Sequence, residues 1–281
     1  MKNLEKEKII TQALVEYKQS GDISLTKLAE KYKISRKTLT KRLKDEGYPI
    51  INKQNEVRID ETMFDVIDSE EKAYWLGFLY ADGNIGSSEY KLEMNLQASD
   101  WEHMKKFQEF LKYKKDEVRI RPSYGKGGPV CRFSIRNKHI WAALNEKGCT
   151  PRKTLTLCFP DKSLFKDPEL LRHFMRGYVD GDGCLGIYPT KTGIDTVLSI
   201  TGMRKFLEAF AEVLGEKATI YDKKNSKASC LQFGYRKARK IARFLYDDAT
   251  IYLQRKFDIY KEFCRLEEQS SMMKSSKNGE S

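Results

Sequence analysis

Long apolar runs and closely spaced cysteines are both missing from this sequence. No apolar run approaches the ~18 residues of a membrane-spanning helix, and the charged segment 1–8 is not followed by the apolar core of a signal peptide. The six cysteines lie far apart and form no C-x-x-C pair, which argues against a zinc site and for reduced, mostly buried thiols. We therefore expect a protein that has no membrane partner and resides in the cytoplasm.

Acidic residues are in deficit. The chain has 40 Asp and Glu against 52 Lys and Arg, so its net charge is +12 and its pI is about 9.2. An excess of this size points to a polyanionic partner, first nucleic acid and second an anionic membrane. The alternative is a basic protein with no such partner. A chain of 281 residues, 40% of them apolar, is long enough for about two domains with cores.

Residues 1–50 predict three short helices. Ser35 is a good N-cap for the third helix, Gly47 is a good stop, and Leu39 and Leu43 form its apolar stripe. A short helix, a tight turn and a basic helix resemble a helix-turn-helix, whose second helix enters the major groove of DNA. The alternative is a small helical bundle with a solvated charged face. The basic residues of the third helix that we predict to contact DNA are Arg36, Lys37, Lys41 and Arg42.

Two segments differ in composition from their surroundings. Residues 51–71 are rich in Asp and Glu, which phosphate would repel, so we predict an acidic linker there. Residues 268–281 are polar and aperiodic, and we predict a disordered tail.

An internal repeat organises the rest of the chain. Gly77, Asp82 and Gly83 recur 100 positions later as Gly177, Asp182 and Gly183. After each motif the sequence predicts two strands, a helix, two strands and a helix; in both pairs the first strand is short. Residues 72–165 and 166–267 are therefore predicted to form two αββαββα repeats. The fold class is α+β, with approximate twofold symmetry.

Each motif is a nearly all-apolar helix that ends in Asp-Gly. A mid-helix glycine costs ~1 kcal/mol relative to alanine, and close packing of the two helices at Gly77 and Gly177 would offset that cost. Asp82 and Asp182 would then converge at two negative helix ends, an arrangement that favours a bound hard cation such as Mg²⁺. The alternative is a plain helix-to-strand turn. An EF-hand is excluded because Lys191 stands where its loop requires a bidentate Glu.

The segments WLGFLYADGNI and MRGYVDGDGCL resemble the paired motifs of the single-chain LAGLIDADG homing endonucleases, over roughly residues 63–265. This resemblance implies that the motif helices form the interface between repeats and that the strands form a saddle on double-stranded DNA. It implies that Asp82 and Asp182 bind the catalytic metal, Mg²⁺ or another hard divalent cation such as Mn²⁺. The preceding motif acid is present as Asp180 but replaced by Tyr80 in the first repeat.

The resemblance also implies further site residues. A basic residue near each scissile phosphate is matched by Lys153 and Lys256, and Asp100 stands where the family often has a water-orienting residue, although Gly202 replaces it in the second repeat. On the wet faces of the predicted strands, the residues expected to contact DNA are Arg119, Arg121, Arg132, Arg136, Lys217 and Lys223. The alternative is an ordinary solvated sheet face.

Three functions fit this pattern. The first is a site-specific, metal-dependent DNA endonuclease that acts as a monomer, because both halves of the symmetric unit lie in one chain. The second is a non-cleaving transcription regulator on the same scaffold, and the third is an RNA maturase. Both motif aspartates are present and a regulator would not need them, so cleavage is favoured. An intein is disfavoured because the sequence starts at Met1 and lacks a His-Asn end.

Overall fold

The structure is a computed structural model that describes residues 2–20, 25–47, 59–114, 118–122, 128–153, 156–191, 193–224 and 226–278. The chain divides into two compact units, Met1–Arg58 and Ile59–Ser281. None of the helices in the described ranges combines the length and the apolar composition needed to cross a bilayer.

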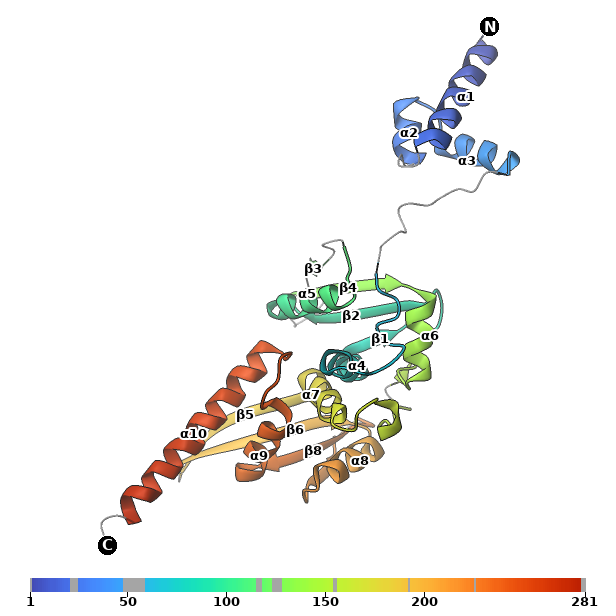
Figure 1. Cartoon of the computed structure of the whole chain (residues 1–281). Helices are drawn as coiled ribbons and strands as arrows, with labels where there is room; N and C mark the ends of the chain where they lie inside the picture. The colour runs from blue at the N-terminus through green and yellow to red at the C-terminus, as the bar shows by residue number, and fades with distance from the viewer. Residues whose placement is uncertain are drawn as a thin grey trace. The chain divides into compact units, whose positions relative to one another are not determined.

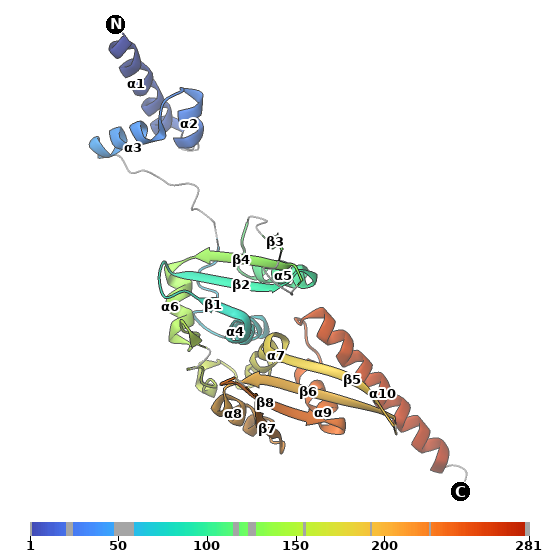
Figure 2. The same cartoon turned by 180° about the vertical axis from the view of Figure 1, so that it is seen from behind.

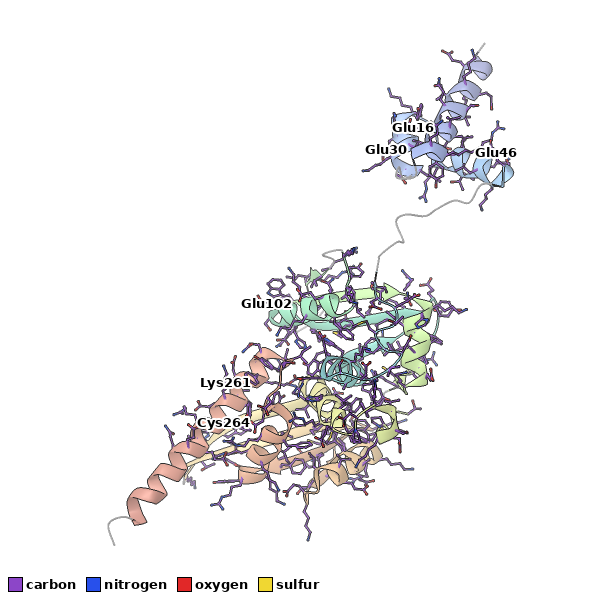
Figure 3. The ribbon with its side chains drawn as sticks, in the orientation of Figure 1. Glu16, Glu30, Glu46, Glu102, Lys261 and Cys264 are labelled. Carbon is purple, nitrogen blue, oxygen red and sulfur yellow. The ribbon has the colours of Figure 1, made fainter. Side chains whose placement is uncertain are left out.

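The first unit contains the three helices that the sequence predicts. They are α1 (Lys2–Ser20), α2 (Leu25–Lys31) and α3 (Arg36–Asp45). Ser35 caps α3 by accepting a hydrogen bond from the backbone N–H of Thr38 at 3.1 Å, and Gly47 has the positive φ of +65° that ends a helix. Glu16, labelled in Figure 3, joins α1 to α2 by an ion pair with Lys31 at 2.6 Å. The small core is closed by Ala13, Leu28, Leu39 and Leu43, all fully buried.

The second unit contains two copies of one pattern (Figure 1). The first copy is α4 (Glu70–Asp82), β1 (Gly83–Ile85), β2 (Lys91–Gln97), α5 (Trp101–Phe110), β3 (Arg119–Arg121), β4 (Val130–Arg136) and α6 (Lys138–Glu146). The second copy is α7 (Leu170–Asp182), β5 (Gly183–Thr190), β6 (Gly193–Gly202), α8 (Arg204–Leu214), β7 (Thr219–Asp222), β8 (Ser229–Gly234) and α9 (Tyr235–Tyr246). A last helix, α10 (Gln254–Asn278), follows, and short 3₁₀ turns lie at Ala98–Asp100 and Lys162–Leu164. The predicted α+β fold of two αββαββα repeats is confirmed.

The strands form two antiparallel sheets with the same order. Sheet 1 is β1-β2-β4-β3 and sheet 2 is β5-β6-β8-β7. Each sheet has a buried face, on which Met94 pairs with Phe133 in sheet 1 and Leu198 with Phe233 in sheet 2. Helices α5, α8 and α9 pack on the buried faces, and Figure 2 shows the sheets from their other, outward faces. The alternation of apolar and polar residues along the strands produces this arrangement.

The acidic segment is more than a linker. Phe64 and Ile67 are fully buried, and the backbone N–H of Asp60 donates to the Leu111 carbonyl at 2.9 Å. Residues 59–71 therefore belong to the second unit, because the apolar residues among the acids pack on its core; residues 51–58 lie outside the described ranges.

The C-terminal tail, which was predicted to be disordered, is helical over most of its length. Helix α10 continues to Asn278, so helix replaces the disorder predicted over 268–278; neither Pro nor Gly interrupts the chain before Gly279. Residues 123–127, between β3 and β4, and Asn225, between β7 and β8, lie outside the described ranges.

Candidate active site at the ends of two paired helices

Helices α4 and α7 pack against each other through their glycines. A Cβ atom added to Gly77 would lie 1.9 Å from the Phe174 carbonyl oxygen, and one added to Gly177 would lie 2.0 Å from the Tyr74 carbonyl oxygen. No side chain fits at such distances, so the two backbones touch. The approach continues to the helix ends, where a Cβ on Gly181 would lie 3.3 Å from Oδ2 of Asp82. The close packing predicted at the two glycines is therefore present.

Asp82 and Asp182 are the last residues of α4 and α7, and this packing brings their carboxylates to one place. Burial and the negative charge of Asp182 raise the pKa of Asp82 to about 6, while Lys256 and Lys153 oppose the shift. Burial also raises the pKa of Asp182, again opposed by the two lysines. Two carboxylates that repel each other at negative helix ends are costly unless a cation compensates them.

The carboxylate of Asp82 is open to a ligand. Among the described residues it takes part in no hydrogen bond or ion pair, and no group of three or more His, Cys, Asp or Glu side chains gathers here. The protein therefore offers a cation two hard oxygen ligands. This donor set fits Mg²⁺ or Mn²⁺, which keep positions for water and phosphate, and does not fit a structural zinc ion, which needs four protein ligands.

Each repeat places a lysine at the carboxyl end of its motif helix. The buried Lys256 ammonium donates to the carbonyls of Val179 at 2.7 Å and Asp180 at 2.6 Å, and burial lowers its pKa to about 8. The partly buried Lys153 donates to the carbonyl of Ala81 at 3.3 Å and to that of Gly83. Both ammonium groups offset the negative ends of the helices and both lower the pKa of Asp82. The structure thus brings Asp82, Asp182, Lys153 and Lys256 together.

Asp180 and Tyr80 break the symmetry of the two motifs. Asp180 is fully buried, and its carboxylate accepts hydrogen bonds from Tyr246 Oη at 2.6 Å, Tyr74 Oη at 2.8 Å and the Leu253 backbone N–H at 2.8 Å. Tyr80 instead donates to the backbone carbonyl of Lys147. The carboxylate of Asp180 is thus bound by three donors of the protein itself, whereas that of Asp82 accepts no hydrogen bond within the described residues.

Asp100 has a partner that the sequence analysis missed. Its buried carboxylate lies 3.2 Å from Nε of Arg255, so an ion pair joins the first repeat to the segment that carries Lys256. Asp100 is engaged with this cation in the structure, and the water-orienting role that the resemblance implies for it stays a prediction.

A cavity of about 310 Å³ opens beside Asp182. It is lined by Lys153, Tyr178 and Thr201, among others, and therefore carries an ammonium, a phenol and a carboxylate. The cavity adjoins Asp182, so solvent reaches the carboxylate of that residue.

The cations predicted to contact DNA differ in whether they already form an ion pair within the protein. On sheet 1, Arg119 and Arg121 are exposed; Arg132 pairs with Glu93, and Arg136 pairs with Glu89 at 2.8 Å. Lys217 and Lys223 flank β7 and do not lie within it as predicted, because the strand spans only Thr219–Asp222.

On α3, Arg36, Lys37 and Lys41 are exposed. The Arg42 guanidinium lies 2.7 Å from the Glu7 carboxylate and is held within the first unit. A groove lined by Lys37, Lys41 and Arg42 runs along this helix.

No family model and no curated protein matches this chain. The solved structures that resemble it include LAGLIDADG homing endonucleases. One is I-LtrWI bound to target DNA (TM-score 0.47, 14% identity, 74% of this chain and 92% of that chain covered). A second is I-SmaMI bound to cleaved DNA (TM-score 0.47, 13% identity, 73% of this chain and 90% of that chain covered). A third is I-GzeII in complex with its DNA target (TM-score 0.47, 12% identity, 73% of this chain and 91% of that chain covered). At these identities the likeness concerns the fold.

Proposed function

We propose that this protein is a site-specific endonuclease that hydrolyses phosphodiester bonds of double-stranded DNA with a divalent metal. The observation that carries the proposal is the meeting of Asp82 and Asp182, with raised pKa values, beside the ammonium groups of Lys153 and Lys256. Carboxylates that attract a metal and cations that attract phosphate are the two requirements of such a site.

The residues divide into two roles. Asp82 and Asp182 would hold Mg²⁺ or Mn²⁺, which when bound supplies polarisation of the phosphate and activation of water. Lys153 and Lys256 anchor the ends of α4 and α7, so they fix the separation of the carboxylates and add positive charge where the phosphate arrives. The near-equivalence of the repeats suits a substrate with two antiparallel strands, one served by each half.

Binding of DNA falls to the outward sheet faces and to α3. The exposed cations Arg119, Arg121, Lys217 and Lys223 lie on or beside the strands, and a two-stranded ribbon fits the major groove. The helix-turn-helix unit would add contacts through Arg36, Lys37 and Lys41. We propose that one chain suffices, because the α4–α7 interface is already formed within it.

The test is digestion of a randomised duplex library with Mg²⁺, followed by sequencing of the new ends. Wild type should produce defined cuts, and Asp82→Asn and Asp182→Asn should lose double-strand cleavage by orders of magnitude while still binding DNA. A matched control is Glu102→Gln on the exposed surface of α5 (Figure 3), which should cut normally. Cleavage at the wild-type rate by either Asn variant would show the metal assignment to be wrong.

A non-cleaving regulator is the second candidate, favoured by the exposed basic surface of α3. The same experiment separates the two, because a regulator enriches a bound sequence and leaves it uncut. Selective binding of structured RNA instead of duplex DNA would indicate a maturase.

A further inference from the structure

The outward faces of the two sheets differ in charge, although the sheets share one topology. On sheet 1 the strand register places Arg119 beside Arg132 on this face, with Arg121, Arg136 and Lys91 further along β3, β4 and β2. The one carboxylate among them is Glu93, which pairs with Lys91 and Arg132. Arg119 and Arg121 form no ion pair within the described ranges, so their guanidinium groups are available to a partner.

Sheet 2 has no cation on its outward face within the described strands. Asp195 is the one charged residue there, and its carboxylate accepts a hydrogen bond from the Tyr235 backbone N–H at 3.2 Å. The remaining outward positions are neutral and are read from the register as Cys184, Gly186, Tyr188, Thr190, Gly193, Val197, Ser199, Thr201, Thr219, Tyr221, Cys230, Gln232 and Gly234.

The neutral face carries exposed aromatic groups. Tyr188 is 50% exposed and lies along its own strand over Gly186, since a Cβ on that glycine would meet the tyrosine ring at 2.5 Å. Tyr221 is 45% exposed and donates from Oη to the Gln232 side-chain carbonyl at 3.1 Å. The Tyr221 ring is thus held by a hydrogen bond, and the Tyr188 ring occupies the space left by the missing side chain of Gly186.

Two cations of the second repeat lie at strand ends instead. Lys217 and Lys223 flank β7, and Nζ of Lys223 lies 2.8 Å from Oγ1 of Thr201, at the rim of the outward face. Cations at a rim suit phosphates, which position DNA without reading its sequence. The neutral residues between them are then the ones placed to contact the bases of a bound duplex.

We propose that the two halves of the DNA target differ in composition: guanines lie under sheet 1, and an A·T-rich segment lies under sheet 2. This inference rests on the proposed function. Arginine pairs with the O6 and N7 atoms of guanine, whereas a neutral face with tyrosine, valine and threonine contacts the methyl group of thymine, and glutamine pairs with adenine. Sheet 1 reads by charge-assisted hydrogen bonds, and sheet 2 by apolar contact and by Gln232.

Selection of bound and cleaved sequences from the randomised library tests the composition. Wild type should enrich guanine in one half of the site and A·T pairs in the other. Arg119→Gln with Arg121→Gln should relax the preference in the guanine half alone, by about tenfold or more per guanine. Tyr188→Ser should relax the A·T half alone, and Glu102→Gln should change neither. Circular dichroism confirms that each variant is folded.

Base analogues test the chemistry on the wild-type protein. Uracil in place of thymine removes only the methyl group and should weaken binding when placed in the A·T half. 7-Deazaguanine removes the N7 acceptor and should weaken binding in the other half. Enrichment of guanines in both halves of the site would overturn the inference. It would also be overturned if the arginine variants changed the preference in the A·T half and uracil there had no effect on binding. Failure of wild type to select any duplex would instead overturn the proposed function.

Discussion

The buried guanidinium of Arg176 lies 2.6 Å from the Glu70 carboxylate, although the two residues are 106 positions apart. Arg176 is fully buried in α7 and also donates to the carbonyls of Ile251 at 3.0 Å and Leu245 at 2.9 Å. Glu70, at the start of α4, additionally accepts from the Thr250 backbone N–H at 2.8 Å. This ion pair holds the start of one motif helix to the middle of the other.

Glu70→Gln should therefore destabilise the second unit. Removing one partner leaves a buried charge without compensation, which costs about 3–5 kcal/mol in buried pairs; Glu70 is partly exposed, so we expect the lower end. Urea unfolding followed by tryptophan fluorescence measures the loss. Glu102→Gln, an exposed acid in α5, is the matched control and should leave the unfolding midpoint unchanged. Equal midpoints for the two variants would show that the pair adds nothing.

Gly77→Ala and Gly177→Ala should each destabilise the fold by about 3 kcal/mol or more. The added methyl group would collide with a backbone carbonyl of the partner helix, which has no rotamer to adopt. Helix propensity alone predicts the opposite sign, a gain of ~1 kcal/mol, so the sign of the change decides between packing and propensity. Gly234→Ala is the control, because no atom lies within 4 Å of its added Cβ.

The stability of the metal-free protein should fall as pH rises from about 4 to about 6. The pKa of Asp82 is raised from 3.8 to about 6, so its protonated form favours the fold; this contribution is complete below the ordinary pKa and is lost as pH passes the raised one. Asp82→Asn should flatten that part of the curve. Unfolding measured at four pH values checks this, and parallel curves for both proteins would contradict it.

Wild type, Asp82→Asn and Asp182→Asn together test metal binding apart from cleavage. At pH 7, Mg²⁺ should raise the melting temperature of wild type, because under the proposed function the folded carboxylate pair binds it and the unfolded chain does not. Asp82→Asn and Asp182→Asn should lose this shift. An equal shift in all three proteins would place the metal elsewhere.

Lys256→Met should cost more stability than Lys153→Met. Lys256 is buried and bonds to several carbonyls, which would be left without a donor at about 1–3 kcal/mol each. Its pKa is lowered to about 8 from an ordinary value of 10.5. The neutral amine therefore favours the fold above pH 10.5, and this contribution is lost as pH falls through 8. Wild type should therefore gain stability as pH rises from about 8 to about 10.5, and Lys256→Met should lack this contribution.

Removal of residues 1–58 should reduce the salt dependence of DNA binding and leave cleavage intact. The cut falls at the boundary between the two compact units, so the second unit keeps its core. Each DNA phosphate that the shortened protein no longer neutralises should lower the slope of log K against log salt by about 0.9. Titrations at several salt concentrations measure the slope, and the untruncated chain is the reference. An unchanged slope would show that α3 does not touch DNA.

The local elements and the repeat could be predicted from the sequence. Periodicity, the Ser35 cap and the Gly47 stop depend on neighbouring residues, and the recurrence of Gly77 and Asp82 after 100 positions indicated two equal units. The mid-helix glycines also indicated contact between α4 and α7, because a residue that costs a helix stability needs a packing reason.

The tertiary structure decided which charges meet. Glu70 pairs with Arg176 across 106 positions and Asp100 with Arg255 across 155. The positions equivalent to Glu70 and Arg176 in the other repeat are Leu170 and Leu76, which carry no charge. No local pattern marks such pairs, because an ion pair depends on distance in space and on the burial of both groups. The same cause explains why Asp82 accepts no hydrogen bond within the described residues while Asp180 accepts three. Asp180 lies two positions before Asp182, the residue equivalent to Asp82. Both acids read alike in the sequence, and only the donors that the fold brings near them make one a structural anchor and leave the other for a ligand.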